Sequence, residues 1–150
     1  MARKKQTVER KLQKRILQNV CSKGNFLDKA NNRAAKDQFI EKFVLCEIAT
    51  KNVLSYYRKV NGKEKDVENI EMGLNTIKAA LCHAQYDVDN EMLEKMFKAK
   101  KKRGERSARD LRNGIVHDLM IPDIQEVIRR KDELFNLMDR YLEIFTSSNL

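Results

Sequence analysis

The chain has 150 residues, of which 41% are hydrophobic and 35% charged, and its formal net charge is +9. One proline and five glycines are too few for the many tight turns of a β-sandwich or barrel. The length fits one domain. No apolar run approaches the roughly 20 residues that cross a bilayer, and the N-terminus has no apolar signal core, so we expect a soluble, cytoplasmic protein without a membrane partner.

Two helices are predicted in the first third of the chain. The first covers about residues 7–22, follows a Thr7 cap, and has apolar residues every four positions: Val8, Leu12, Ile16 and Val20. Gly24 is expected to end it in a left-handed conformation. The second is long and substantially buried, continues to Asn61–Gly62, and has a wide apolar stripe of Phe39, Phe43, Cys46, Ala49 or Thr50, Val53 or Leu54, and Tyr57.

Two shorter helices are predicted next. Asp66 caps a third helix whose apolar residues keep their register for two heptads: Val67, Ile70, Leu74, Ile77 and Leu81. Such a stripe packs either inside the domain or against a second copy. Asp89 caps a fourth helix, which precedes a basic segment and has an inward face of Met92, Leu93, Met96 and Phe97.

The C-terminal third predicts two more helices. Ser107 and Asp110 nearly match a capping box and open a helix with a buried stripe of Leu111, Ile115 and Leu119. Pro122 stops that helix and suits the first position of the last one, which continues to Phe145 with residues 129–133 on its exposed side. The predicted fold is therefore an all-α bundle of five or six helices, in a single domain over residues 1–150.

The positive charge is concentrated in two segments. Residues 1–24 contain eight Lys/Arg and one Glu, and residues 98–106 contain six Lys/Arg and one Glu; the rest of the chain, with 17 basic and 20 acidic residues, is net −3. Clustered positive charge attracts RNA, DNA or an acidic protein surface. The alternative is a solvated basic face with no partner.

The cysteines and metal-ligand patterns indicate little chemistry. Cys21, Cys46 and Cys82 are odd in number and far apart, which fits a reducing compartment and cysteines that fill core positions. No His-x3-His or Cys-x-x-Cys pair occurs, so no metal and no other cofactor is expected.

The two histidines lie in different contexts. His83 lies near a helix end, where a histidine is typically a terminal hydrogen-bonding group. His117 lies one helical turn after Asn113 and on the same side as Asp110, away from the apolar stripe of its helix. Gly114 costs this helix about 1 kcal/mol relative to alanine, which indicates that a backbone or ligand approaches closely there.

The segment 107–119, Ser-Ala-Arg-Asp-Leu-Arg-Asn-Gly-Ile-Val-His-Asp-Leu, contains Arg-Asn-x-x-x-His, and with the amphipathic helix after it resembles the HEPN family of nucleotide-binding and ribonuclease domains. The resemblance extends over residues 107–145; the first hundred residues share only their helical character.

This resemblance implies a metal-independent endoribonuclease of toxin or defence type, whose paired domains share a cleft. Arg112 would bind the scissile phosphate, His117 would move protons, Asn113 would position His117 or the RNA backbone, and Asp110 would support His117. The reaction implied is attack by the RNA 2′-hydroxyl, which leaves a 2′,3′-cyclic phosphate.

The motif supplies one histidine, His117, per chain, and this favours a homodimer, because cleavage benefits from a base and an acid. The basic segment would contact the RNA backbone through Lys98, Lys100, Lys101, Lys102, Arg103 and Arg106. The resemblance also implies a separate antitoxin or regulatory protein. The alternative function is a noncatalytic helical module that binds nucleic acid, a nucleotide or a protein partner.

Overall fold

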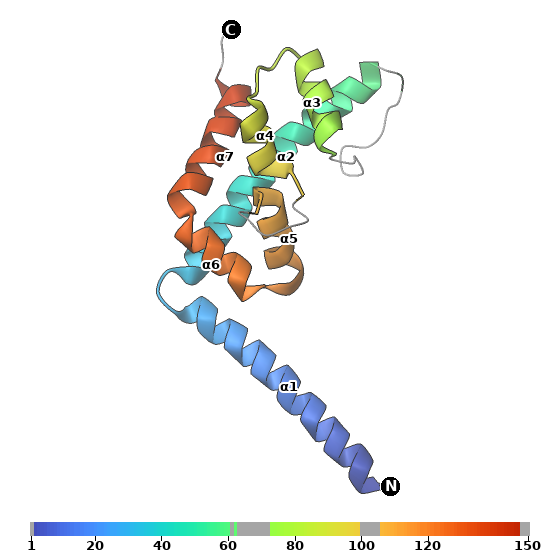
Figure 1. The fold of residues 1–150 in the computed structure, drawn as a ribbon, viewed down its shortest axis with the longest axis vertical. Helices are drawn as coiled ribbons and strands as arrows, with labels where there is room; N and C mark the ends of the chain where they lie inside the picture. The colour runs from blue at the N-terminus through green and yellow to red at the C-terminus, as the bar shows by residue number, and fades with distance from the viewer. Residues whose placement is uncertain (1, 61, 63–72, 100–105, 148–150) are drawn as a thin grey trace.

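A computed structural model describes residues 2–60, 62, 73–99 and 106–147, with the side chains of residues 2–6 excluded. The described part of the chain is all-helical and contains no strand, which confirms the predicted fold class (Figure 1). It contains seven helices: α1 (Ala2–Asp28), α2 (Asn32–Val60), α3 (Leu74–His83), α4 (Asn90–Phe97), α5 (Ala108–Asp118), α6 (Ile121–Arg129) and α7 (Lys131–Thr146).

The core is built around α2, which lies against α3, α5, α6 and α7. Its predicted stripe is confirmed, since Phe39, Phe43, Cys46 and Leu54 are fully buried. Thr50 is buried as well; its hydroxyl donates to the Cys46 carbonyl at 2.8 Å and so accepts from the Tyr141 hydroxyl at 2.5 Å. These bonds satisfy the polar atoms that the α2–α7 interface removes from water.

The first helix is longer than predicted, and Gly24 does not end it. Gly24 lies inside α1, where a glycine costs only about 1 kcal/mol. Leu27 and the partly buried Phe26 pack against the core, so the helix continues to Asp28, and the chain reverses at Ala30, whose φ is 45°. Most of α1 projects away from the bundle in Figure 1.

Only the second half of the third predicted helix lies within the described residues. Gly73 has an extended backbone, with φ −70° and ψ 141°, and α3 begins at Leu74. Ile77 and Leu81 are buried as expected. The rest of the prediction, namely Asp66, Val67 and Ile70, lies outside the described residues.

Two predicted helix starts are confirmed. The Asp89 carboxylate accepts a hydrogen bond from the Glu91 amide at 3.3 Å, and the Ser107 hydroxyl accepts one from the Asp110 amide at 3.2 Å. All four predicted core residues of α4 are buried. Both caps are local patterns, so they could be predicted without knowledge of the tertiary structure.

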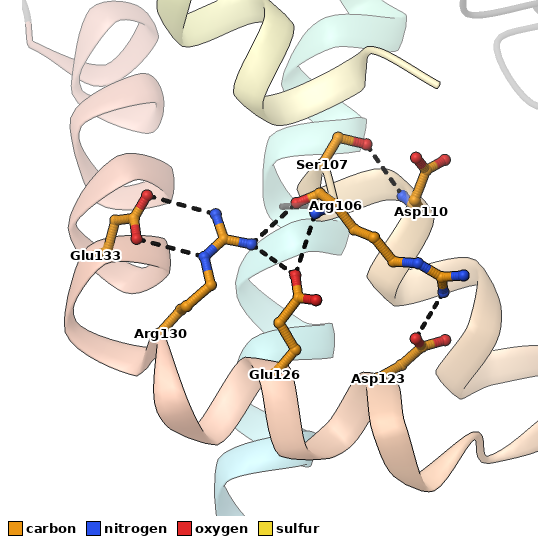
Figure 2. Close-up of polar contacts among 7 residues, drawn as sticks. All are labelled: Arg106, Ser107, Asp110, Asp123, Glu126, Arg130 and Glu133. Carbon is orange, nitrogen blue, oxygen red and sulfur yellow. Dashed lines mark hydrogen bonds and ion pairs between the residues drawn. The ribbon is translucent and has the colours of Figure 1, made fainter. Parts of the chain in front are cut away.

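The last predicted helix is two helices, α6 and α7, which meet at Arg130. Pro122 is the second residue of α6 rather than the first. The sequence pattern predicts an exposed Arg130, yet this residue is only 7% exposed. Its guanidinium donates to Glu126 at 2.7 Å, to the Arg106 carbonyl at 3.0 Å, and to both carboxylate oxygens of Glu133 (Figure 2). The break therefore occurs where one buried arginine joins α6, α7 and the start of α5.

Only one of the three cysteines fills a core position. Cys46 is fully buried, and burial raises the pKa of its thiol to about 12, whereas Cys21 and Cys82 are exposed. Because the thiolate is the reactive form, we expect two of the three thiols to react with a disulfide reagent at neutral pH in the native protein, and all three after unfolding. A thiol titration that finds three fast-reacting groups in the native protein would contradict the burial of Cys46.

Candidate functional site

The residues of the Arg-Asn-x-x-x-His pattern all lie on α5. Ser107 caps the start of this helix, and Leu119 ends it in a left-handed conformation with φ 46°. Leu111 and Ile115 anchor one side of α5 in the core. Asn113 and His117 lie on the side of α5 away from these two residues, at or near the protein surface as predicted, whereas Arg112 lies nearer to them, about 60° around the helix from Ile115.

Arg112 is held in a defined position. Its Nη1 donates to Asn113 Oδ1 at 3.1 Å, and its Nη2 lies 3.9 Å from Glu47 Oε1 on α2. The guanidinium carbon lies 5.8 Å from the centre of the Phe43 ring, a cation–π distance. The side chain is 26% exposed, and its buried Nε has no hydrogen-bond partner. The Nε–H donor of the guanidinium is thus left unsatisfied. Its two terminal nitrogens have partners on α5 and α2.

His117 lies in the last turn of α5 and is exposed. Within the described residues it makes no hydrogen bond to Arg112 or Asn113, so a single chain joins Arg112 to Asn113 but does not join either to His117. Val116 and Met120, beside His117 in the sequence, are 49% and 41% exposed. The end of α5 therefore exposes an imidazole and, within three residues of it in the sequence, two apolar side chains.

The C-terminal end of α1 lies beside the C-terminal end of α5. Lys23 donates from its ammonium group to the carbonyl oxygen of Asp118, the residue after His117. This bond also satisfies one of the carbonyl groups that the end of α5 leaves without a helical partner. The contact links the base of the projecting helix to the neighbourhood of His117.

Arg106 has a buried acidic partner on α6. Its Nη1 donates to Asp123 Oδ1 at 2.6 Å, and its backbone amide donates to Glu126 at 3.2 Å (Figure 2). The Arg106 side chain is 50% exposed, whereas that of Asp123 is 6% exposed. Burial raises the pKa of the Asp123 carboxyl, and the positive charge of Arg106 offsets part of that effect. Arg106 thus helps to join the start of α5 to α6, a role its place in the basic segment did not predict.

The close approach predicted at Gly114 is made by Asp123. A Cβ at Gly114 would lie 1.7 Å from Asp123 Oδ2 and 2.9 Å from its carboxyl carbon. Since Arg106 holds the other carboxylate oxygen, the side chain has little freedom to move. Gly114 thus allows α5 and α6 to pack closely, and its presence is explained by packing.

Gly114→Ala is therefore expected to destabilise the fold by about 1–3 kcal/mol, because overpacking exceeds the gain in helix propensity. Urea unfolding of the variant measures this free energy. In Gly24→Ala, where a Cβ meets nothing within 4 Å, the same change is expected to stabilise the protein slightly. Equal stabilisation by both substitutions would show that Asp123 does not pack against Gly114.

The remaining predicted site residues are only partly described. Lys98 is exposed at the end of α4 and lies 3.8 Å from Glu94, while Asp110 lies in the first turn of α5. Lys100, Lys101, Lys102 and Arg103 lie outside the described residues. His83 lies at the end of α3, as predicted, with its ring 5.5 Å from that of Tyr57.

Sequence reasoning missed Glu47 and Phe43 as neighbours of Arg112. Both lie on α2, at positions separated by one helical turn, and no local pattern pairs them with a residue of α5. In the described parts of the chain, no three His, Cys, Asp or Glu side chains cluster as a metal site would require. None of the described helices combines the length and the apolar character needed to cross a membrane.

Comparison with known proteins leaves the chain without an assigned family. No family model matches it, and neither a curated protein nor a solved structure does.

Proposed function

We propose that this chain is a metal-independent endoribonuclease of toxin or defence type, built on a HEPN-like helical domain and acting as a homodimer in the cytoplasm. The observation that carries the proposal is the pair Arg112 and Asn113 at one surface of α5, with His117 exposed in the last turn of the same helix. A guanidinium can bind a phosphate through two parallel hydrogen bonds, and an imidazole can transfer protons near neutral pH.

The cleavage would use the RNA 2′-hydroxyl as the nucleophile. One imidazole takes the proton from this hydroxyl while its oxygen forms a bond to the adjacent phosphorus. The bond from phosphorus to the 5′-oxygen breaks, and a second imidazole gives a proton to the departing oxygen. The products are a 2′,3′-cyclic phosphate and a 5′-hydroxyl. Arg112 would stabilise the charge that grows on the phosphate oxygens.

Two chains supply the two imidazoles, since each chain has one His117. This fits the geometry of α5, in which His117 is exposed next to the exposed Val116 and Met120 rather than turned toward Arg112. Exposed apolar residues around a polar group are typical of a surface that a partner covers. The composite site would then combine residues of both copies.

The contact between Arg112 and Glu47 favours a second candidate, a noncatalytic module that binds nucleic acid, a nucleotide or a protein partner. An arginine held by a carboxylate, a carboxamide and an aromatic ring can serve packing alone. In that case the basic segment, with Lys98 exposed at its start, binds a polyanion without cleaving it.

Comparing Arg112→Ala with Arg129→Ala separates the two functions. Arg129 is exposed at the end of α6, so its removal lowers the positive charge equally. We expect wild type and Arg129→Ala to cleave total RNA and Arg112→Ala to lose at least about 100-fold in rate, since it removes a donor to the developing charge. RNA binding without cleavage by folded, dimeric wild type would favour the binding module; equal cleavage by all three proteins would exclude Arg112 from the reaction.

A regulatory protein partner, such as an antitoxin, is part of the same proposal, because a free ribonuclease would damage the cell that makes it. Co-expression with candidate partners and recovery of a complex that lacks RNA cleavage would support it. Full cleavage by the protein in every complex recovered would count against such control.

A further inference from the structure

The apolar face of α1 is bare along most of its length. Val8, Leu12, Ile16, Leu17 and Val20 are between 52% and 65% exposed. At about 100° per residue, Leu27 lies within about 20° of Ile16 and Val20 around the helix. The side of α1 that packs on the core at Leu27 therefore continues outward as the bare stripe. A helix in this state gains little from tertiary packing, the main source of helix stability in proteins.

A second exposed apolar stripe lies on α2, beside its core residues and on the outer part of the helix. Leu45, Ile48, Tyr56 and Val60 are between 47% and 56% exposed. From Leu45 to Val60 the stripe extends about 22 Å, and from Val8 to Val20 the stripe of α1 extends about 18 Å, at 1.5 Å per residue. Both stripes are apolar, and the α2 stripe is long enough to cover that of α1.

Within one chain the two stripes do not meet. The Lys23–Asp118 bond and the buried Leu27 fix the end of α1 against the bundle, and Figure 1 shows the rest of α1 directed away from α2. We propose that the α1 stripe packs on the α2 stripe of a second copy of this chain, and that the exchange is reciprocal in a two-fold dimer. An isologous interface of this kind buries both stripes of both copies.

The area agrees with a stable dimer. Eighteen apolar side chains, nine per chain, would be covered. At roughly 50 Å² for each half-exposed side chain, they contribute about 900 Å² of apolar area, which corresponds to about 1,600 Å² of total interface when just over half is apolar. This is the usual size of a specific protein–protein interface.

The charges favour α2 over a second α1 as the partner. Two α1 helices side by side would bring together two segments that each carry +7 over residues 1–24. Residues 37–60 of α2, by contrast, hold three acidic and four basic residues, so their net charge is only +1, and two of their exposed side chains, Asp37 and Glu41, are acidic. Packing α1 on α2 therefore avoids the repulsion between two strongly basic segments, which favours this pairing over α1 with α1.

Sedimentation equilibrium of Ile16→Glu, Ile48→Glu and Gln18→Glu tests the pairing. Gln18 lies across α1 from the stripe, so its substitution adds the same charge outside the interface. We expect wild type and Gln18→Glu to form the dimer with similar dissociation constants. For Ile16→Glu and Ile48→Glu we expect dissociation constants at least about tenfold higher, because each of these substitutions buries a carboxylate twice in the two-fold interface. Thermal melting checks that both variants fold; their substitutions lie at exposed positions.

A monomeric wild type would overturn the inference. So would an Ile48→Glu variant that dimerises like wild type, because α1 would then pair with another α1 or with a different surface. Dimerisation does not depend on catalysis, so a dimer that cleaves no RNA would leave this inference intact while removing the proposed nuclease.

Discussion

His117→Ala is expected to lower the rate of RNA cleavage by about 10²–10⁴-fold, because a positioned general acid or base contributes about that much. In a symmetric dimer the substitution removes both proton-transfer groups at once. RNA binding is expected to persist, since the phosphate-binding guanidinium and the basic segment remain. The measurement is the cleavage rate on a labelled RNA oligonucleotide, together with its dissociation constant.

His83→Ala is the matched control for that experiment. His83 is the other histidine of the chain, is exposed like His117, and lies at the end of α3 against Tyr57. Its substitution is expected to leave the cleavage rate unchanged. An equal loss of rate in the two variants would indicate a general effect on folding, and an unchanged rate in His117→Ala would remove the imidazole from the mechanism.

The largest effect on stability is expected from Arg130→Ala. The side chains of Arg130 and Glu126 are 6% and 16% exposed, and removal of one partner leaves the other charge poorly compensated. The Arg106 carbonyl and Glu133 also lose their donors (Figure 2). Breaking a buried pair of this kind costs about 3–5 kcal/mol. Urea unfolding measures the loss.

Two further variants define what Arg130 contributes. Arg130→Lys keeps the charge but cannot reach three partners at once, so an intermediate loss is expected. Arg129→Ala, one residue earlier and exposed, is expected to change the free energy of unfolding by less than about 0.5 kcal/mol. Equal stabilities of Arg129→Ala and Arg130→Ala would show that the junction of α6 and α7 does not depend on this network.

The Arg130 network also predicts a pH dependence. The hydrogen bond from Arg130 lowers the pKa of Glu133 below its ordinary value of 4.5. A lowered native pKa stabilises the fold above the unfolded pKa, and this contribution is lost as the pH falls through the native pKa. The stability difference between wild type and Arg130→Ala should therefore shrink below about pH 4.5. A constant difference at lower pH would contradict the Glu133 contact.

The features that could be predicted from the sequence depend on nearby residues. Asp89 and Ser107 could be placed as caps because the capping groups and the amides they bind lie two or three positions apart. The buried face of α2 followed from helical periodicity. The placement of Arg112, Asn113 and His117 on one helix followed in the same way, from their spacing.

The features that could not be predicted depend on contacts between distant segments. The junction at Arg130 requires Arg106, and the position of Arg112 requires Glu47 on another helix. Periodicity marks an apolar face but does not show what covers it, so the exposure of Ile16 on α1 had no sequence signal. Gly114 indicated a close approach, but only the fold identified Asp123 as the approaching group.

The most direct test of the proposed nuclease is incubation of purified wild type with an RNA oligonucleotide in excess EDTA, followed by analysis of the fragment ends. A matched oligonucleotide carries one 2′-deoxy sugar at the cleaved position. We expect 2′,3′-cyclic phosphate and 5′-hydroxyl ends from the RNA and no cleavage at the 2′-deoxy position, because the nucleophile is missing there. Intact RNA with a folded, dimeric protein free of bound partners, or cleavage at the 2′-deoxy position, would contradict the proposed reaction.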